Sequence, residues 1–464
     1  MSYPRLIASV LCLFVVVCAG PLAFAGEPCR IEVIDADNGW PVPLVELRTT
    51  NHQRFVTDNA GVIALDAPEL MGRATFFHIE GHGYCVPADG FGYAGVRITA
   101  EPGQTIRIEV NRTNIAKRLG RLTGTGLFAE SQQLGDDPDW QDGPTVGQDT
   151  VQLARYNDKL FWLWGDTTLL DYPLGVFDST AATTDAQPFA SFEPPLRPVF
   201  DYYIDDTTSR PRGVADLSGS GPTWLGGMIA LPGADGREHL VATYAKIRGF
   251  LHAYERGLCE WDDTTQSFER VRVLWHEDAG DRQEMRWHNG HPFRYTDAQG
   301  ERWVAVGNPM PTIRFPATYE AWRDPSTWLA CEPGPPIQAA DGSGEVVPHT
   351  GSIAYNAYRD KWVVVFMQRF GSPSAFGELW YAEADDPMGA WGPAVKILSH
   401  NNYTFYNPRI HPELTGDDDS FIVFEGTYTA MFADDPEPTP RYDYNQILYR
   451  LDLDDPQLAP SREE

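Results

Sequence analysis

Acidic side chains fall at the ends of several short strands that the sequence predicts. Asp149 stands just before one such strand, Asp166 follows the next, and Glu378 and Glu425 hold comparable places much later in the chain. Two carboxyl groups held across a small pocket can cleave a glycosidic bond. One protonates the leaving oxygen, while the other activates water or attacks the anomeric carbon. These four residues are the candidate catalytic groups.

Each of the four acids also has an ordinary structural interpretation. Asp149 could cap a turn, and Asp166 could form an Asx turn within Gly-Asp-Thr. Glu378 could be a solvated loop residue. Glu425 follows an apolar stretch and needs solvent or a partner, for which Arg409 or Arg441 would serve.

Other polar side chains near the same strand ends are candidates for binding a substrate. A His among them could instead complete a buried hydrogen-bond network, and an Arg could lock neighbouring elements together. No CxxC or HExxH motif occurs, so no metal ligands are assigned. The candidate substrate-binding residues are Gln148, His291, His349, Asn407, Arg409, Tyr428 and Arg441.

A repeated hairpin must position these groups. Trp303, Trp362 and Phe421 each open the second strand of a copy, and each is 59 residues from the next. A period near 60 built from short strands is typical of β-propeller blades, which bury their faces only against neighbours. The five predicted blades span residues 145–210, 222–277, 288–335, 346–398 and 403–455.

The predicted topology brings the candidates to one rim. Successive strands of a blade are antiparallel, so the start of strand one, the end of strand two and the start of strand three meet at the same edge. Small-molecule sites lie where side chains converge on a rigid scaffold in this way. The last blade shows three strands, and we expect residues 122–128 to supply the fourth. A linker over 113–144 includes a short helix expected within 111–121, and residues 456–464 read as a polar tail.

The N-terminus predicts export. Arg5, the apolar stretch 6–17 and Ala23-Phe24-Ala25 form a signal peptide over residues 1–25. We therefore expect a secreted, periplasmic or cell-surface protein with no membrane span after signal removal, and a monomer. The net charge of −29 argues against nucleic acid or an anionic membrane as a partner. Aromatic residues, 12% of the chain, supply flat faces suited to sugars.

Residues 27–112 differ from the rest of the chain. Short alternating strands separated by turn residues predict a small β-sandwich. The stretch GWPVPLVELRTTNHQRFVTDNAGVIAL resembles the carboxypeptidase-regulatory-like or transthyretin-like domains, which implies an accessory role. In an exported protein a Cys29–Cys85 disulfide is expected, while Cys259 and Cys331 are expected as free, buried thiols.

The repeated region also carries a resemblance. The frames GQDTVQLARYNDKLFWLWGDTTL and GELWYAEADDPMGAWGPAVKIL resemble the five-bladed propeller glycoside hydrolases, which include arabinanases and β-xylosidases, and most closely the domain-of-unknown-function 4185 group. The resemblance implies that Asp149 is the base or nucleophile and that a later blade brings a Glu acid. Blade three, however, opens with His288–His291 after Glu284, and blade two has Gly226-Gly227 where the arabinanase pattern has Asp. No cofactor is required, although the relatives allow a structural Ca²⁺ in the central channel.

The sequence thus predicts an all-β protein, a β-sandwich followed by a five-bladed propeller. The predicted function is a glycoside hydrolase acting on a polysaccharide or oligosaccharide. Asp149 would be the base or nucleophile, Glu425 or Glu378 the acid, and Asp166 a group that tunes pKa or position. Two alternatives stay open: a non-catalytic carbohydrate-binding or surface-assembly propeller, and a polysaccharide lyase using His291 or Tyr428 with Arg409.

Overall fold

The computed structural model describes residues 26–279, 290–416, 419–434 and 437–462. Strands dominate it, so the predicted all-β class is confirmed. The signal peptide and Glu284 lie outside the described residues. No helix within the described ranges is both long and apolar enough to cross a membrane.

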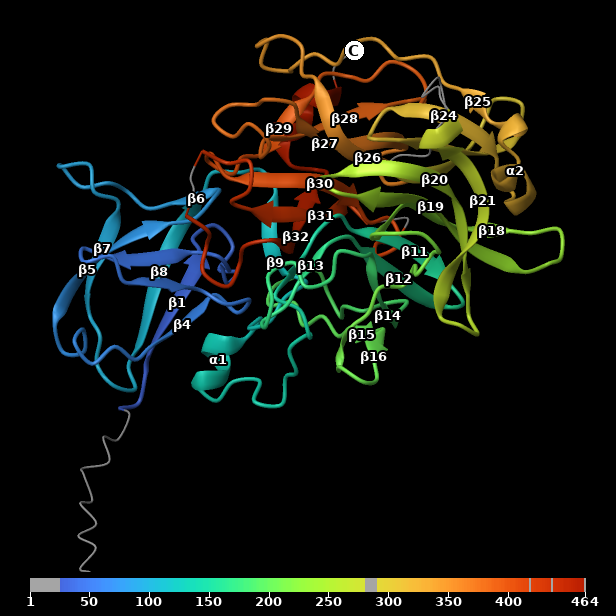
Figure 1. The fold of residues 1–464 in the computed structure, drawn as a ribbon. Coiled ribbons are helices and arrows are strands. Elements are labelled where there is room, and N and C mark those ends of the chain that lie inside the picture. Colours follow the sequence, from blue (N-terminus) through green and yellow to red (C-terminus); the bar gives the residue numbers. More distant parts are fainter. Residues whose placement is uncertain (1–25, 280–289, 417–418, 435–436, 463–464) are drawn as a thin grey trace, which may run out of the picture.

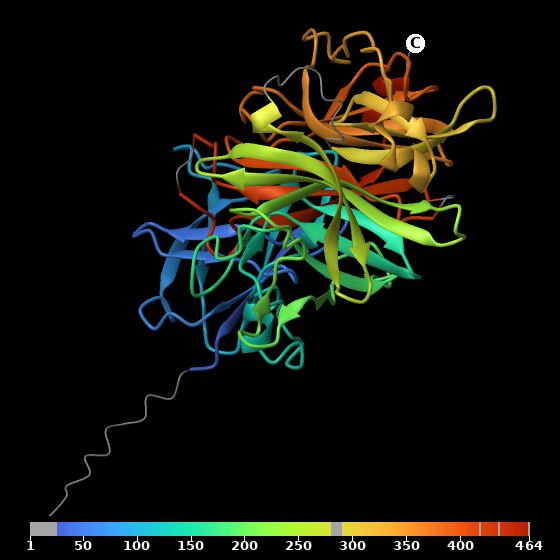
Figure 2. The same cartoon turned by 45° about the vertical axis from the view of Figure 1, so that its right-hand side comes forward.

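Two four-stranded sheets form the N-terminal region, which lies to one side of the rest of the chain in two views (Figures 1 and 2). Their apolar side chains, such as Val33, Leu47 and Phe77, form one core cluster between them. The first sheet has the order β4 (Val62–Leu65), β1 (Cys29–Asp35), β8 (Thr105–Arg112) and β6 (Tyr84–Cys85). The second has the order β3 (Arg54–Val56), β2 (Glu46–Thr49), β5 (Ala74–Glu80) and β7 (Gly95–Thr99).

The described chain also forms five four-stranded antiparallel sheets, which we number sheets 1 to 5; the first four are built in sequence order, and the fifth takes its outer strand from β9. Sheets 1 and 2 are β11 (Gln152–Tyr156), β12 (Lys159–Trp164), β14 (Thr180–Asp185), β15 (Asp201–Tyr202), and β18 (Thr223–Pro232), β19 (Glu238–Arg248), β20 (His252–Asp262), β21 (Ser267–His276). Sheets 3 and 4 are β22 (His291–Thr296), β23 (Arg302–Gly307), β24 (Pro311–Pro316), β25 (Leu329–Ala330), and β26 (Pro348–Asn356), β27 (Lys361–Gln368), β28 (Leu379–Ala384), β29 (Val395–Leu398). Sheet 5 is β30 (Thr404–Ile410), β31 (Phe421–Thr429), β32 (Asn445–Asp452) and β9 (Lys117–Arg121).

Short elements complete the described chain. The helical ones are α1 (Ala129–Gln133), α2 (Tyr319–Arg323) and the 3-10 turns η1 (Glu277–Ala279), η2 (Pro325–Thr327) and η3 (Pro456–Arg462). The remaining strands form two-stranded ladders, β10 (Gly147–Gln148) with β13 (Thr167–Thr168) and β16 (Ile204–Asp205) with β17 (Arg210–Pro211).

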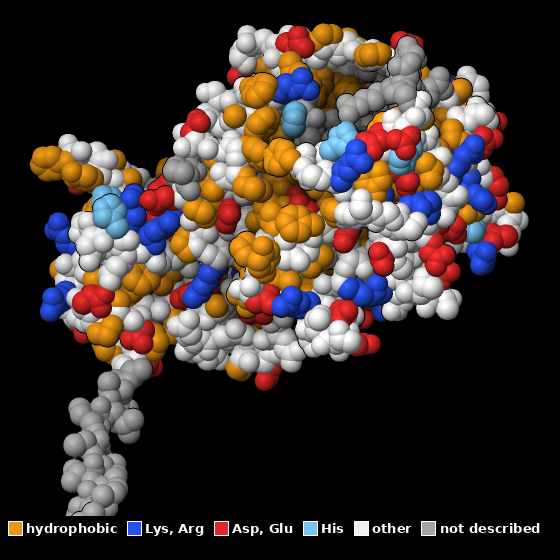
Figure 3. Space-filling view, in the orientation of Figure 1, with side chains coloured by type: hydrophobic (Ala, Val, Ile, Leu, Met, Phe, Trp, Pro, Cys, Tyr) orange, Lys and Arg blue, Asp and Glu red, His pale blue; other side chains and the backbone are white. Residues whose placement is uncertain are grey.

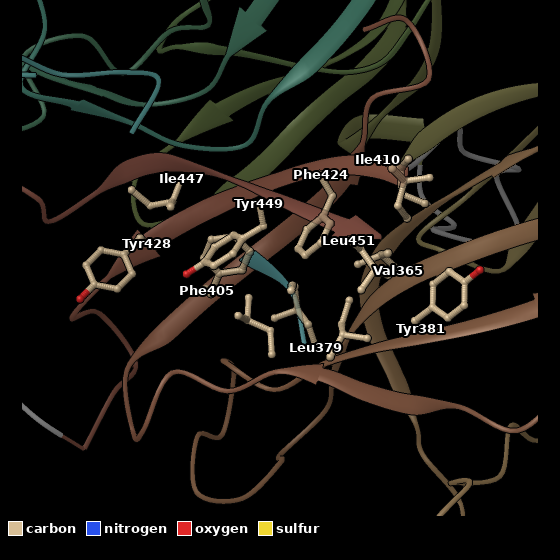
Figure 4. Close-up of a cluster of buried hydrophobic side chains, with 14 of the residues drawn as sticks. Val365, Leu379, Tyr381, Phe405, Ile410, Phe424, Tyr428, Ile447, Tyr449 and Leu451 are labelled. Carbon is tan, nitrogen blue, oxygen red and sulfur yellow. The ribbon is translucent and has the colours of Figure 1, made fainter. Parts of the chain in front are cut away.

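Each sheet packs on the next. The first strands contact one another in the order β11, β18, β22, β26 and β30. Sheet 5 returns to sheet 1, where Leu153 and Trp162 share a core cluster with Val423 and Leu448. Between sheets 4 and 5, side chains such as Leu379, Phe424 and Tyr449 interdigitate (Figure 4). The core is therefore divided among the interfaces between successive sheets.

The outer strand of sheet 5 comes from the N-terminal side, but not from the predicted residues. β9 pairs with β32 through Ile447↔Arg121 and Leu448↔Gly120, so the closing strand ends before residues 122–128 begin. This strand also replaces the second half of the helix expected within 111–121. Leu119 is fully buried there, and the buried Arg118 and Arg121 guanidinium groups donate to backbone carbonyls, with Arg118 Nε also donating to the Tyr449 hydroxyl.

Three smaller predictions have different outcomes. Cys29 and Cys85 are both free, so the expected disulfide is wrong. β8 explains this, since Arg30 pairs with Thr105 at one end and Cys85 with Asn111 at the other, roughly 20 Å along the strand. Cys259 is free and buried as predicted, and Cys331 is free but only half-buried. The expected polar tail forms η3, whose Leu458 is fully buried against β28 and β29.

Candidate active site

Asp149 and Asp166 lie side by side where sheet 1 begins and its second strand ends. The β10–β13 ladder pairs Gln148 with Thr167 just beyond them. Two backbone hydrogen bonds join the aspartates' own segments, from Gly165 N to Asp149 O (2.8 Å) and from Asp149 N to Asp166 O (3.3 Å). The backbone therefore fixes both carboxyl groups at one edge of the sheet.

The Asp149 carboxyl is held tightly by its neighbours. Tyr406 donates its hydroxyl to Oδ2 (2.8 Å), and Tyr444 provides a second hydroxyl donor. A Cβ on Gly165 would stand 2.3 Å from Oδ1, so only glycine leaves room for this carboxyl. Burial raises the pKa of Asp149, and the two hydroxyls oppose that shift by stabilising the anion.

Asp166 has the opposite chemical character. Its Oδ1 is buried and has no hydrogen-bond partner. Burial and the nearby Asp149 charge raise the pKa of Asp166 to about 7, although the Trp224 indole acts to lower it. The surroundings of the two groups therefore differ: two hydroxyl donors stabilise the Asp149 anion, whereas Asp166 has an unpartnered oxygen and a pKa raised to about 7.

A cavity of about 300 Å³ opens beside the two carboxyl groups. Sheet 1 contributes the aspartates, and sheet 2 contributes the facing wall. Gly226 lies within β18 on this wall, and a Cβ there would approach only Thr243 Oγ1, at 3.9 Å. Gly226, where the arabinanase pattern would have Asp, therefore borders open space.

Glu425 does not reach this cavity. It lies in the middle of β31, opposite Arg409, and its side chain is fully buried. Its nearest ionisable partner is His411, whose Nε2 lies 3.4 Å from Oε1. Burial raises the pKa of Glu425 to about 8, with Arg409 acting to lower it. The strand continues to Thr429, so Glu425 sits deeper than a strand end.

Glu378 is also enclosed by protein. Its Oε2 lies 2.8 Å from Lys396 Nζ, and Ser399 donates to Oε1 (2.7 Å). The side chain is fully buried even though it precedes a strand at the predicted edge. The structure thus separates Glu378 and Glu425 from the Asp149–Asp166 pair.

Two of the predicted binding residues make hydrogen bonds to protein groups near the Asp149–Asp166 pair. Gln148 is buried, donating to Thr180 Oγ1 (2.9 Å) and accepting from Tyr202. Asn407 has a positive φ of 52° and donates through Nδ2 to Thr150 Oγ1 (2.9 Å). It therefore connects sheet 5 to the residue after Asp149.

The other predicted binding residues are elsewhere. Arg409 makes two contacts to Glu413 and donates to Leu153 O (2.7 Å), which locks sheet 5 to sheet 1. Tyr428 contacts His82 Nδ1 (3.0 Å) of the N-terminal region, and Arg441 pairs with Glu130.

The two histidines sit at strand starts. Burial lowers the pKa of His291 to about 3, and the nearby Arg409 charge adds to the shift. His349 packs near Phe376, with its Nδ1 unpartnered.

The possible structural Ca²⁺ in the central channel stays a prediction. Within the described ranges, no three His, Cys, Asp or Glu side chains are grouped to hold a metal ion. His291 Nδ1 lies 3.2 Å from Gln152 Nε2, an amide nitrogen that only donates. The other ring nitrogen therefore carries the proton and has no free lone pair.

Sequence reasoning missed Tyr406, Tyr444 and Trp224. Tyr406 is the last regular pair before a register shift between Tyr406 and Arg409, and Tyr444 has a φ of 58°. Neither irregularity has a readable sequence pattern. Trp224 follows the same strand-start rule as Asp149, so that rule could have identified it.

Comparisons with known proteins do not assign this chain to a family. No family model matches the chain, and no curated protein matches it. A solved putative hydrolase of Bacteroides ovatus shares 12% identity, with 67% of this chain and 87% of that chain covered, at a TM-score of 0.40. An exo-1,5-α-L-arabinanase from a bovine ruminal metagenomic library shares 10% (67% and 95% covered, TM-score 0.37). An α-L-arabinofuranosidase of Podospora anserina shares 12% (71% and 94% covered, TM-score 0.37). At these identities and TM-scores the likenesses carry no argument about activity.

Proposed function

We propose that this protein is an exported glycoside hydrolase that uses Asp149 and Asp166 as its two catalytic carboxyl groups. The observation that carries the proposal is this adjacent pair at one cavity, in which Asp149 accepts hydroxyl hydrogen bonds and Asp166 has an unpartnered carboxyl oxygen. We further propose that sheets 1 to 5 are the blades of a five-bladed propeller and that the N-terminal sheets form an accessory sandwich.

The roles follow from the surroundings of each group. Asp166 is protonated near neutral pH and donates its proton to the glycosidic oxygen. Asp149, stabilised as an anion by Tyr406 and Tyr444, either deprotonates water or attacks the anomeric carbon. This assignment moves the acid role from Glu425 or Glu378 to Asp166, because both glutamates are enclosed by protein.

The lyase alternative would use His291 or Tyr428 as the base, with Arg409 to neutralise a uronate. Tyr428 is engaged with His82 and Thr439, and Arg409 is paired with Glu413. The cavity beside Asp149 and Asp166 is lined by none of these three residues, which favours hydrolysis over elimination at that cavity.

The test is a reducing-end and thin-layer screen of the mature chain on arabinans, xylans, galactans, fucans and pectins. Wild type would run beside Asp149→Asn and Asp166→Asn. New reducing ends from wild type alone support the proposal. Products with unsaturated ends would show that the reaction is elimination and not hydrolysis. Binding without turnover would favour a non-catalytic carbohydrate-binding propeller.

A further inference from the structure

The cavity beside Asp149 and Asp166 has two chemically different sides. The carboxyl groups stand on sheet 1. Sheet 2 and its β19–β20 hairpin contribute nine lining residues, of which three are Gly226, Thr243 and Arg256. The other six are apolar or aromatic, and we call them the sheet 2 wall: Trp224, Leu225, Ala245, Ile247, Leu251 and Ala253. Because these six side chains offer few hydrogen-bond partners to sugar hydroxyls, they favour contact with an apolar group.

The edge of the wall is an exposed apolar hairpin between β19 and β20. Phe250 is 92% exposed and Leu251 is 61% exposed. The hairpin is braced, because Arg248 and His252 at its two ends both contact Glu277, at 2.6 and 3.0 Å. Leu251 adopts a φ of 56°, which is costly for a branched side chain. Exposed apolar groups on a braced, strained hairpin are typical of a binding surface.

The loop between β13 and β14 also exposes large apolar side chains. Leu170 is 81% exposed and Tyr172 is 62% exposed. The loop is tied to the wall by a hydrogen bond from Trp224 Nε1 to Phe177 O (2.9 Å). Exposed apolar side chains thus occur on both loops that border the sheet 2 wall.

The wall lies on the side of the general acid. Asp166 interacts with the Trp224 indole, whereas Asp149 is turned toward Tyr406 and Tyr444. The group protonated by Asp166 is the leaving oxygen, so the leaving group extends toward Trp224 and Leu251.

We propose that the sheet 2 wall is a subsite for an apolar leaving group, so that the preferred substrates are glycosides whose aglycone carries an aromatic, alkyl or acyl group. This inference rests on the proposed hydrolase function for the direction of the leaving group. The subsite itself is a binding property and is measured without turnover.

The experiment compares matched pairs of probes. Dissociation constants would be measured by ligand-observed NMR for phenyl and methyl α-L-arabinofuranoside, β-D-xylopyranoside and β-D-galactopyranoside. For at least one sugar, the phenyl glycoside should bind about tenfold more tightly than the methyl glycoside, as expected for one well-buried apolar group. Leu251→Ser should remove that preference. Phe91→Ser, at a side chain 90% exposed in the N-terminal region, should keep it.

Equal binding of phenyl and methyl glycosides, no binding of any probe, or a preference unchanged in Leu251→Ser would each overturn the subsite. The two proposals fail separately. A phenyl preference in a protein that cleaves nothing would reject the hydrolase and keep the subsite. Hydrolysis without a phenyl preference would keep the hydrolase and reject the subsite.

Discussion

Asp166 and Glu425 are both acids whose pKa is raised far above its usual range, to about 7 and about 8, yet their surroundings differ. Asp166 borders a cavity and has a second carboxyl beside it. Glu425 is sealed between sheets 5 and 1, next to His411 and Arg409. A raised pKa reports removal from water, which both share. Access to a ligand separates a candidate catalyst from a buried structural acid.

The largest expected difference between the two regions is in turnover. Asp149→Asn should lower kcat by about 10²- to 10⁴-fold, the usual loss when an acid–base group is removed. Glu425→Gln should change kcat by less than about twofold. Reducing-end kinetics at pH 6 to 7, on the substrate found by screening, would measure kcat for both variants. Equal losses in the two variants would contradict the separation of roles.

The second difference concerns stability and pH. The folded-state pKa of Glu425 is about 8, against an ordinary value of 4.5. Between these pH values the folded chain holds a proton that the unfolded chain has lost. The free energy of unfolding should therefore fall as pH rises, by about 1 kcal/mol per pH unit. The contribution is fully present below pH 4.5 and is lost as pH passes 8. Urea unfolding of wild type and Glu425→Gln from pH 5 to 8 measures it, and parallel curves would contradict it.

The third prediction tests the donors to Asp149. Tyr406→Phe removes one of two hydroxyls that stabilise the anion, so kcat should fall about tenfold. The acid limb of the pH–rate profile should also move to higher pH. Tyr428→Phe loses an equally buried hydroxyl far from the cavity and should keep both kcat and the acid limb. An unshifted limb in Tyr406→Phe would remove Tyr406 from the site.

The smallest effect is expected from filling the cavity. Gly226→Val adds a side chain into open space with ordinary contact to Thr243, so KM should rise several-fold while Tm moves by less than about 2 °C. Ala234→Val, in the exposed β18–β19 turn, is the matched control. An unchanged KM would mean that substrate does not occupy this part of the cavity.

Strand periodicity and the antiparallel rule predicted the meeting of Asp149 with Asp166, because both depend only on where strands begin and end. How deeply each acidic side chain is buried was harder to predict. Glu425 reads as a strand end, but β31 continues four residues further, to Thr429. Glu378 does stand at a strand start, yet Lys396 and Ser399 of the neighbouring strand and its end enclose it. Such pairing across a sheet depends on register, which no local pattern specifies.

The other residues of the site, Tyr406 and Tyr444, could not be predicted because they lie at backbone irregularities. The register shift that follows Tyr406 and the positive φ of Tyr444 are not marked by turn residues in the sequence. The closing strand was placed a few residues late for a similar reason. β9 has the sequence KRLGR, whose arginines are buried by hydrogen bonds that a hydrophobicity pattern does not anticipate.

The central claim is that Asp166 gives the proton and that Asp149 either activates water or attacks the anomeric carbon. The most direct measurement compares Asp166→Asn and Asp149→Asn on a polysaccharide and on the fluoride of the same sugar, whose leaving group needs little protonation. Asp166→Asn should lose about 10²- to 10⁴-fold on the polysaccharide but less than about tenfold on the fluoride, while Asp149→Asn should lose about 10²- to 10⁴-fold on both. Equal losses on both substrates in Asp166→Asn, or an active Asp149→Asn, would contradict the account.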